Sequence, residues 1–154
     1  PWESFKNVDA RVGVMIATLH DLIPASKKAI PSLFCLTPDA LLDCLTQQGI
    51  QFEVHRIVDG EWDLARNSLC DDEIFELIQL GDAKHCGECI LVPEACTRHN
   101  LSELRCHSSE LKRFIRDFDI EDFFDGDVII ACRESRTLTI VHHEGVYVHA
   151  KIPS

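Results

Sequence analysis

The chain has 154 residues, 45% of them hydrophobic and 27% charged, and a formal net charge of -11. This composition excludes an intrinsically disordered chain and suits one folded domain with a real core, which we expect to span residues 1–154. The negative charge disfavours free nucleic acid and anionic membrane as partners, because a phosphate surface is bound through Lys and Arg. We therefore expect a basic protein partner, a cation or a simple solubilising surface, and the sequence leaves the oligomeric state open.

The apolar residues and the cysteines indicate the compartment. No apolar run reaches the roughly 18 residues that a membrane-spanning helix needs. The eight Cys residues are many for this length. Several of them, including Cys44 and Cys132, fall at apolar positions of predicted helices and strands. Disulfide-stapled proteins are usually smaller and poorer in core, so we predict mostly reduced, buried thiols in a cytoplasmic protein.

Two helices are predicted in the first third of the chain. Apolar residues recur at helical spacing over residues 8–23, up to the stop at Pro24. The sequence Thr37-Pro38-Asp39 predicts a second helix start, with Thr as the N-cap, Pro at the first helical position and Asp near the positive end of the helix dipole. Gly49 follows this helix where a left-handed residue often closes one.

The middle of the chain alternates short apolar runs with turn residues. Residues 25–32 contain two lysines and a proline and are predicted to form a loop. The remaining patterns predict strands at residues 32–36, 50–58, 62–64, 88–93 and 101–107, and a helix at residues 71–80.

The stretch from residue 108 to residue 152 organises the predicted fold. Ser108 is predicted to cap a helix whose apolar residues run to Phe118. Residues 117–127 form an acidic loop. Three strands then follow at residues 128–132, 137–143 and 146–152, because apolar residues alternate with period two. Glu144-Gly145 is expected to be a two-residue turn with Gly at positive φ.

The order of these elements predicts the fold class. Helices come first and the last strands run consecutively, which is typical of an α+β fold with a mostly antiparallel sheet. We expect a C-terminal three-stranded meander packed against three to four helices that cover one face of the sheet.

Four possible zinc ligands have suggestive spacing. Cys86 and Cys89 form a CxxC pair, and Cys96 and His99 a CxxH pair, which are ligand types of tetrahedral zinc. The segment between the pairs looks like a strand, and it would hold them roughly 20 Å apart unless the chain folds back after Pro93. Structural thiols and an exposed loop are the alternative. A redox CxxC is disfavoured because an apolar strand follows Cys89, where such motifs have a helix N-terminus.

The pair His142-His143 lies at the tip of the predicted last hairpin. Adjacent strand residues point to opposite faces, so we expect the two imidazoles not to chelate one metal ion together. His142 shares a face with Leu138 and Ile140 and is expected to be partly buried and hydrogen-bonded. The chain contains no GxSxG, HExxH, P-loop or GxGxxG motif, so the sequence offers no anchor for an enzyme.

The acidic loop at residues 117–127 holds six acidic residues and no basic one. A calcium loop of the EF-hand type is excluded, because Asp122 stands where the turn demands Gly and Val128 where a bidentate Glu is needed. The loop's three phenylalanines are expected to be core anchors that turn the acids outward. Such a cluster is either a solvated face or a docking surface for a cationic protein. The predicted partner-binding residues are Asp117, Asp119, Glu121, Asp122 and Asp125.

These features give a leading functional hypothesis and two alternatives. In general character the chain resembles the small acidic α+β proteins that bacteria use as inhibitors of cationic toxins, although no residue motif carries this resemblance. The leading hypothesis is a protein-binding module, of the immunity-protein kind, that neutralises a basic partner. One alternative is a zinc-binding or thiol-dependent protein that uses the Cys86, Cys89, Cys96 and His99 cluster. The other is an accessory domain of a larger enzyme.

Overall fold

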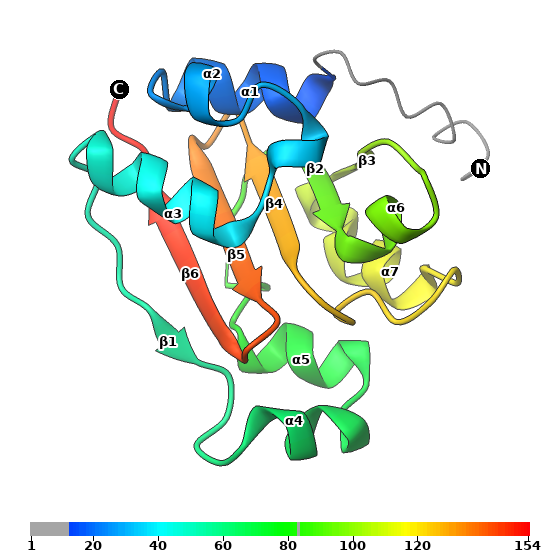
Figure 1. The fold of residues 1–154 in the computed structure, drawn as a ribbon. Coiled ribbons are helices and arrows are strands. Elements are labelled where there is room, and N and C mark those ends of the chain that lie inside the picture. Colours follow the sequence, from blue (N-terminus) through cyan, green and yellow to red (C-terminus); the bar gives the residue numbers. More distant parts are fainter. Residues whose placement is uncertain (1–12, 83) are drawn as a thin grey trace.

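The computed structural model describes residues 13–82 and 84–154 (Figure 1). Its centre is a six-stranded sheet with the order β1-β6-β5-β4-β2-β3, in which every neighbouring pair is antiparallel. The predicted α+β class and the C-terminal meander are therefore confirmed. The strands are β1 (His55–Arg56), β2 (Glu88–Pro93), β3 (Leu104–His107), β4 (Val128–Cys132), β5 (Thr137–His142) and β6 (Val146–Lys151).

The helices of the described residues are short. The first three α-helices precede β1 in sequence, and the others lie between strands. In that part of the chain, none has the length and apolar character needed to cross a membrane. The α-helices are α1 (Val14–Leu22), α2 (Ser26–Ala29), α3 (Pro38–Gln47), α4 (Trp62–Ala65), α5 (Asp71–Leu77), α6 (Glu94–Arg98) and α7 (Leu111–Asp117). Single 3-10 turns are η2 (Leu33–Cys35), η3 (Arg66–Ser68) and η4 (Ser108–Glu110).

Helices cover both faces of the sheet, so the prediction of one covered face is wrong. The first face packs against α1, α2 and α3, and its buried strand residues are all apolar. We call it the aliphatic face. The second face packs against α5 and α7 and carries cysteines, aromatic residues and buried polar groups. We call it the mixed face. The central strand β4 is buried at all five positions, because Ile129 and Ile130 point into opposite cores.

The two helices that the sequence predicts in the first third of the chain correspond to α1 and α3. Helix α3 begins after Thr37, whose Oγ1 accepts the backbone N–H of Ala40 at 3.1 Å, and Gly49 follows it with φ 75°. Helix α1 ends before Pro24 as expected. The part of the predicted first helix that precedes residue 13 lies outside the described residues.

Several short predicted elements are wrong. The predicted loop at residues 25–32 contains the one-turn helix α2, and the predicted strand at residues 32–36 contains the 3-10 turn η2. Of residues 50–58 only His55 and Arg56 pair in the sheet. The predicted strand at residues 62–64 is helix α4. Trp62 is buried while Leu64 is 70% exposed, so the two do not share the one face that alternate strand residues would occupy.

The start of α7 differs from the prediction because Ser108 has another partner. Its Oγ accepts the backbone N–H of Gly87 at 3.1 Å, which ties the start of β2 to the end of β3. The Nδ1 of His107 accepts the N–H of Ser109 instead, and a 3-10 turn precedes the α-helix. Ser108 is therefore a tertiary contact and not the predicted N-cap.

The last hairpin has a three-residue connection, where a two-residue turn was predicted. Strand β5 ends at His142, β6 begins at Val146, and these two residues are paired. The N–H of Gly145 donates to the carbonyl of His142 at 2.9 Å. Gly145 has φ 91°, so its predicted positive φ is confirmed. A three-residue hairpin loop with a left-handed last residue is a common form in proteins.

Candidate functional site

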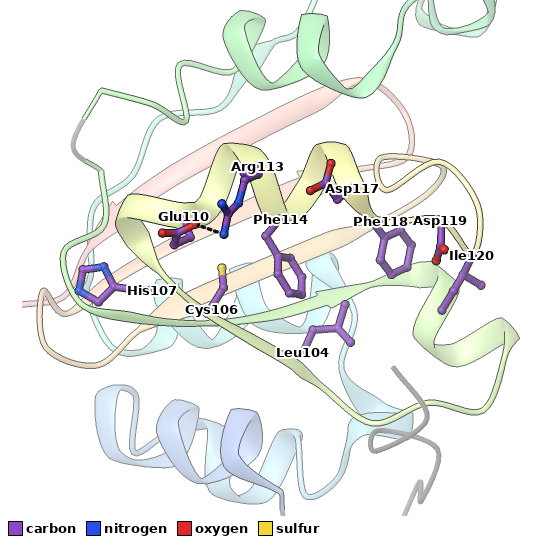
Figure 2. Close-up of a pocket in the computed structure, with 10 residues that line it drawn as sticks. All are labelled: Leu104, Cys106, His107, Glu110, Arg113, Phe114, Asp117, Phe118, Asp119 and Ile120. Atoms are coloured by element: carbon purple, nitrogen blue, oxygen red, sulfur yellow. Dashed lines mark ion pairs between the residues drawn. The ribbon is translucent and has the colours of Figure 1, made fainter. Parts of the chain in front are cut away.

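An open groove of about 580 Å³ lies beside β3, at one edge of the sheet (Figure 2). Its walls are β3, η4, α7 and the first residues of the acidic loop. Figure 2 shows side chains from all four elements turned toward the same space. A volume of this size falls in the usual range of roughly 300–1,000 Å³ for ligand clefts. The lining residues are Leu104, Cys106, His107, Glu110, Arg113, Phe114, Asp117, Phe118, Asp119 and Ile120.

The floor of the groove is apolar. Leu104 is buried, while Phe114, Phe118 and Ile120 are only partly buried at the edge of the mixed-face core. Phe114 belongs to α7, and Phe118, four residues later, directly follows the helix end, so both rings reach the groove from one side of the helix. Among the described residues, the groove thus keeps aromatic and aliphatic surface partly exposed.

The rim of the groove is acidic. Among the described lining residues, Glu110, Asp117 and Asp119 supply three carboxylates, and Arg113 supplies a single guanidinium. The guanidinium of Arg113 lies 2.7 Å from the carboxylate of Glu110, so this pair is largely neutralised. Asp117 and Asp119 are exposed, and Asp117 has Arg116 beside it at 3.6 Å. The rim therefore keeps net negative charge next to an apolar floor.

The structure divides the predicted partner-binding acids into two groups. Glu121 pairs with Arg98 and His99, and Asp125 pairs with Arg66 and Arg98. The Arg98 guanidinium lowers the pKa of Glu121 and keeps it charged. These two carboxylates hold α6 and η3 to the loop. Asp117, Asp119 and Asp122 are exposed, and of these Asp117 and Asp119 line the groove.

The rest of the loop is anchored in the core of the mixed face, as the sequence predicted for its phenylalanines. Phe123 is fully buried and Phe124 nearly so, and their rings meet edge to face at 5.1 Å between centroids. The carboxylate of Asp71 accepts both of their backbone N–H groups, at 2.8 and 3.1 Å. Burial raises the pKa of Asp71, and the two backbone hydrogen bonds oppose that rise.

The four predicted zinc ligands lie in different surroundings. Cys89 and Cys96 are buried, Cys86 is exposed, and the Nε2 of His99 lies 2.8 Å from Glu121. In the described ranges, the structure does not bring three of these four ligand atoms within 4.8 Å of one another. Burial raises the pKa of Cys96 to about 12 and that of Cys89 further. Both thiols are therefore harder to ionise than an exposed cysteine.

The eight cysteines are all free, and fewer are buried than the sequence predicted. Four are buried, Cys106 is partly buried, and three are exposed. Cys106, Cys89 and Cys132 face one another in register across β3, β2 and β4. Burial raises the pKa of Cys106, which lines the groove, to about 11.

A chain of hydrogen bonds on the mixed face was not predicted. His85 binds the hydroxyl of Thr137 through Nδ1 at 2.7 Å and that of Thr139 through Nε2 at 2.8 Å. The Thr139 hydroxyl also lies 2.7 Å from Nδ1 of His149, whose Nε2 lies 2.6 Å from the carbonyl of Ile78. The only feature of the sequence that bears on this hydrogen-bond chain is the alternation of Thr137 and Thr139 with apolar residues. That alternation predicted that the two threonines lie on a solvent-facing side of the strand.

For neutral imidazoles, the Ile78 carbonyl fixes the direction of every hydrogen bond in this chain. A carbonyl only accepts, so His149 donates from Nε2 and accepts the Thr139 hydroxyl hydrogen at Nδ1. Thr139 then accepts from Nε2 of His85, and His85 accepts from Thr137. This pattern holds for neutral imidazoles, and the lowered pKa values of both residues favour that state at neutral pH. Burial lowers the pKa of His149 and, with His149 nearby, lowers that of His85 to about 4.

The hairpin tip corrects the prediction that His142 and His143 diverge. Their rings stack with centroids 4.3 Å apart, because the strand ends at His142 and the chain turns at His143. One ligand atom from each ring and one carboxylate oxygen of Asp127 lie within 4.8 Å of one another. His142 is partly buried, and its Nδ1 accepts a backbone hydrogen bond, as the sequence predicted.

Known proteins add no functional assignment to this geometry. Comparisons with protein-family models, with curated proteins and with solved structures give no match to this chain.

Proposed function

We propose that the protein is a binding module that holds a basic, extended segment of a partner protein in the groove beside β3. The observation that carries this proposal is the combination, at one sheet edge, of an apolar floor and an acidic rim. An anionic rim selects a cationic segment, and an apolar floor takes the side chains between its charges. A folded partner that presents such a segment from a loop or terminus fits the same site.

The position of β3 supports an extended ligand. Among the described residues β3 pairs with β2 on one side and with no strand on the other. A sheet edge presents backbone N–H and C=O groups that a further strand can use, and many peptide-binding domains add a ligand strand in this way. Side chains of an added strand alternate, so every second one would meet the apolar floor.

The charge of the whole chain supports a basic partner. The net charge of -11 attracts cations over a distance, and the exposed acids at the groove bring that attraction to one place. Inhibition of a cationic toxin by a protein of the immunity kind is the biological role that we propose for this chemistry. We place the protein in the cytoplasm, where a reducing environment keeps thiols free.

A matched pair of charge variants tests the site. The probe is a fluorescein-labelled peptide of alternating Lys and Leu, and a Glu-Leu peptide of equal length controls for apolar binding. In Asp117→Asn with Asp119→Asn, association with the Lys-Leu peptide is expected to slow about two- to fivefold and to depend less on salt. The matched control, Asp59→Asn with Asp63→Asn, removes the same charge from exposed positions outside the groove. Stopped-flow anisotropy measures both.

Two results would contradict the proposal. The first is an unchanged association rate in the groove variant. The second is an equal loss in both variants, which would mean that the peptide senses only overall charge. Amide chemical-shift mapping locates the bound peptide, and the shifted residues are expected to centre on β3 and α7.

A further inference from the structure

We propose that Asp127, His142 and His143 form a binding site for a divalent cation of the zinc class. Two imidazole nitrogens and one carboxylate oxygen lie within 4.8 Å of one another there. The site is at the tip of the β5–β6 hairpin, and the groove described above does not include any of its residues. It is a property separate from the proposed peptide binding.

Strand pairing brings these three residues together. Val128 of β4 is paired with Val141 of β5, so Asp127 and His142 are the next residues outward on the two neighbouring strands. The turn then places His143 beside Asp127, next to the start of β4. The Oδ1 of Asp127 accepts the backbone N–H of His143 at 2.8 Å and lies 2.8 Å from its Nδ1. The two histidines are therefore fixed relative to Asp127 by backbone geometry, and little of this arrangement depends on long, mobile side chains.

The ligand types and distances suit zinc and its neighbours. Imidazole nitrogen suits Zn, Cu, Fe and Ni, whereas Mg and Ca prefer sites made of oxygen ligands alone. Around a tetrahedral zinc ion with bonds of 2.0–2.2 Å, ligand atoms lie roughly 3.3 Å apart. Small side-chain rotations can bring the ligand atoms from within 4.8 Å of one another to this spacing. The side chain of His143 is 53% exposed and has room for such a rotation. Three protein ligands leave a fourth position for water.

A second carboxylate is placed to orient His142. The Nδ1 of His142 accepts the backbone N–H of Glu144 at 3.1 Å, so Nε2 carries the ring hydrogen in the neutral form. This Nε2 lies 3.4 Å from Oδ1 of Asp39, at the start of α3. A metal-binding histidine commonly directs its other N–H to a carboxylate. We therefore expect Nδ1 to bind the ion and Asp39 to face the opposite nitrogen, while water replaces the exposed Glu144 contact.

The charges around the site favour a cation. Glu144 and Glu94 lie close enough to act on His143 electrostatically, in the same direction as Asp127. Asp39 adds a further carboxylate at His142. In the absence of an ion, a hydrogen bond between His143 and Asp127 occupies the same atoms. On binding, the ring hydrogen of His143 would move from Nδ1 to Nε2 by exchange with water, and the cation would bind Nδ1 and the Asp127 oxygen directly.

Calorimetric titration of the metal-free full chain with ZnCl₂ tests the site. We expect one zinc ion per chain, and at least about tenfold weaker binding in His143→Ala and in Asp127→Asn. Asp39→Asn is expected to weaken binding less, because it alters only the orientation of His142. Two matched controls, His99→Ala and Cys86→Ser, remove possible ligands outside the site and are expected to keep the affinity.

The remaining outcomes overturn the proposal. One is that the wild-type chain binds no zinc. Another is that the double variant His142→Ala with His143→Ala binds zinc unchanged. The third is that Cys86→Ser loses zinc binding, which would place the ion at the thiols. The absorption spectrum of the Co²⁺-loaded protein identifies the ligand type independently. Nitrogen and oxygen ligands produce visible bands without the strong near-ultraviolet band of a thiolate. Thermal melts verify that each variant is folded, and the exposed His143 makes its variant the safest of the set.

Discussion

The two faces of the sheet are built from the same strands and use different chemistry. On the aliphatic face the buried strand residues are Ile, Leu, Val and Ala, and they pack on α1 and α3. On the mixed face the same strands present Cys, Thr and His beside Phe and Tyr. The difference teaches that a fully apolar layer can supply cohesion while the opposite layer accommodates polar groups, provided that every polar atom finds a partner.

The mixed face meets this condition through its hydrogen-bond chain. In the described part of the protein, no buried side-chain nitrogen or oxygen lacks a hydrogen-bond partner. The groove is at the edge of this same face, where Phe114 and Phe118 remain partly exposed. Four experiments test how different the two faces are.

The largest expected effect comes from placing a hydroxyl on each face of β4. Ile129 and Ile130 are adjacent, buried and directed into opposite cores. Ile129→Thr should lower the free energy of unfolding by about 2–4 kcal/mol, from lost packing and an unpaired hydroxyl. Ile130→Thr should cost only about 1–2 kcal/mol, because the new hydroxyl faces Thr139 in the paired register and can bond to it. Urea melts measure both, and equal costs would remove the distinction between the faces.

The next effect concerns pH and the neutral histidines. Burial lowers the pKa of His85 from 6.5 to about 4, so the unfolded chain binds the proton more readily. This contribution to stability is complete above about pH 6.5 and is lost as the pH falls toward 4, by up to about 3 kcal/mol. We expect His85→Gln to be less stable at pH 7 and to have a shallower loss of stability between pH 6.5 and 4.5. Parallel pH dependences for the two proteins would show that His85 does not supply this effect.

A smaller effect is expected at Gly145, where the hairpin meets the mixed face. Its φ is 91°, and a Cβ there would meet Cβ and Cγ of Trp62 at 2.5 Å. Gly145→Val should therefore destabilise by roughly 1–3 kcal/mol, from backbone strain and displacement of Trp62. Glu144→Ala, one residue earlier and exposed, is the control and should be nearly neutral. The same midpoint for both variants in a urea melt would be inconsistent with a required glycine.

The smallest effect is chemical and leaves the fold unchanged. Cys35, Cys70 and Cys86 are exposed, whereas the buried thiols include Cys89 and Cys132 on the mixed face. A disulfide reagent at neutral pH should react quickly with about three thiols per chain, and with all eight after unfolding. Fast reaction of all eight in the native protein would mean that the mixed face opens to solvent.

The structure also changes how the acidic loop is best tested. Replacing Glu121 and Asp125 along with the outer acids would break the pairs with Arg98 and Arg66. Any loss of binding could then come from a loosened loop. Asp117 and Asp119 are the informative positions, because they line the groove and make no contact with either arginine. Partner binding through any of the five acids stays a prediction.

The sequence determined the elements whose pattern is local. Strands β2 and β4 have the predicted bounds, β5 and β6 differ by one residue at their ends, and α3 begins at its predicted cap. Period two, period 3.6 and a Thr-Pro start are properties of neighbouring residues, so one chain suffices to read them. The positive φ of Gly145 is of the same kind.

Only the tertiary structure decided which residues meet across the fold. The bond between Arg66 and Asp125 joins residues 59 positions apart, and that between His85 and Thr139 joins residues 54 apart. A residue's polarity does not reveal whether packing will give it a partner. From their polarity, Thr139 and His149 were expected on a solvent-facing side of the sheet, but Thr139 is buried and His149 partly buried. His142 and His143 were expected to point to opposite faces, but their rings stack. Burial and partner choice depend on distant segments that come together only when the sheet closes against its helices.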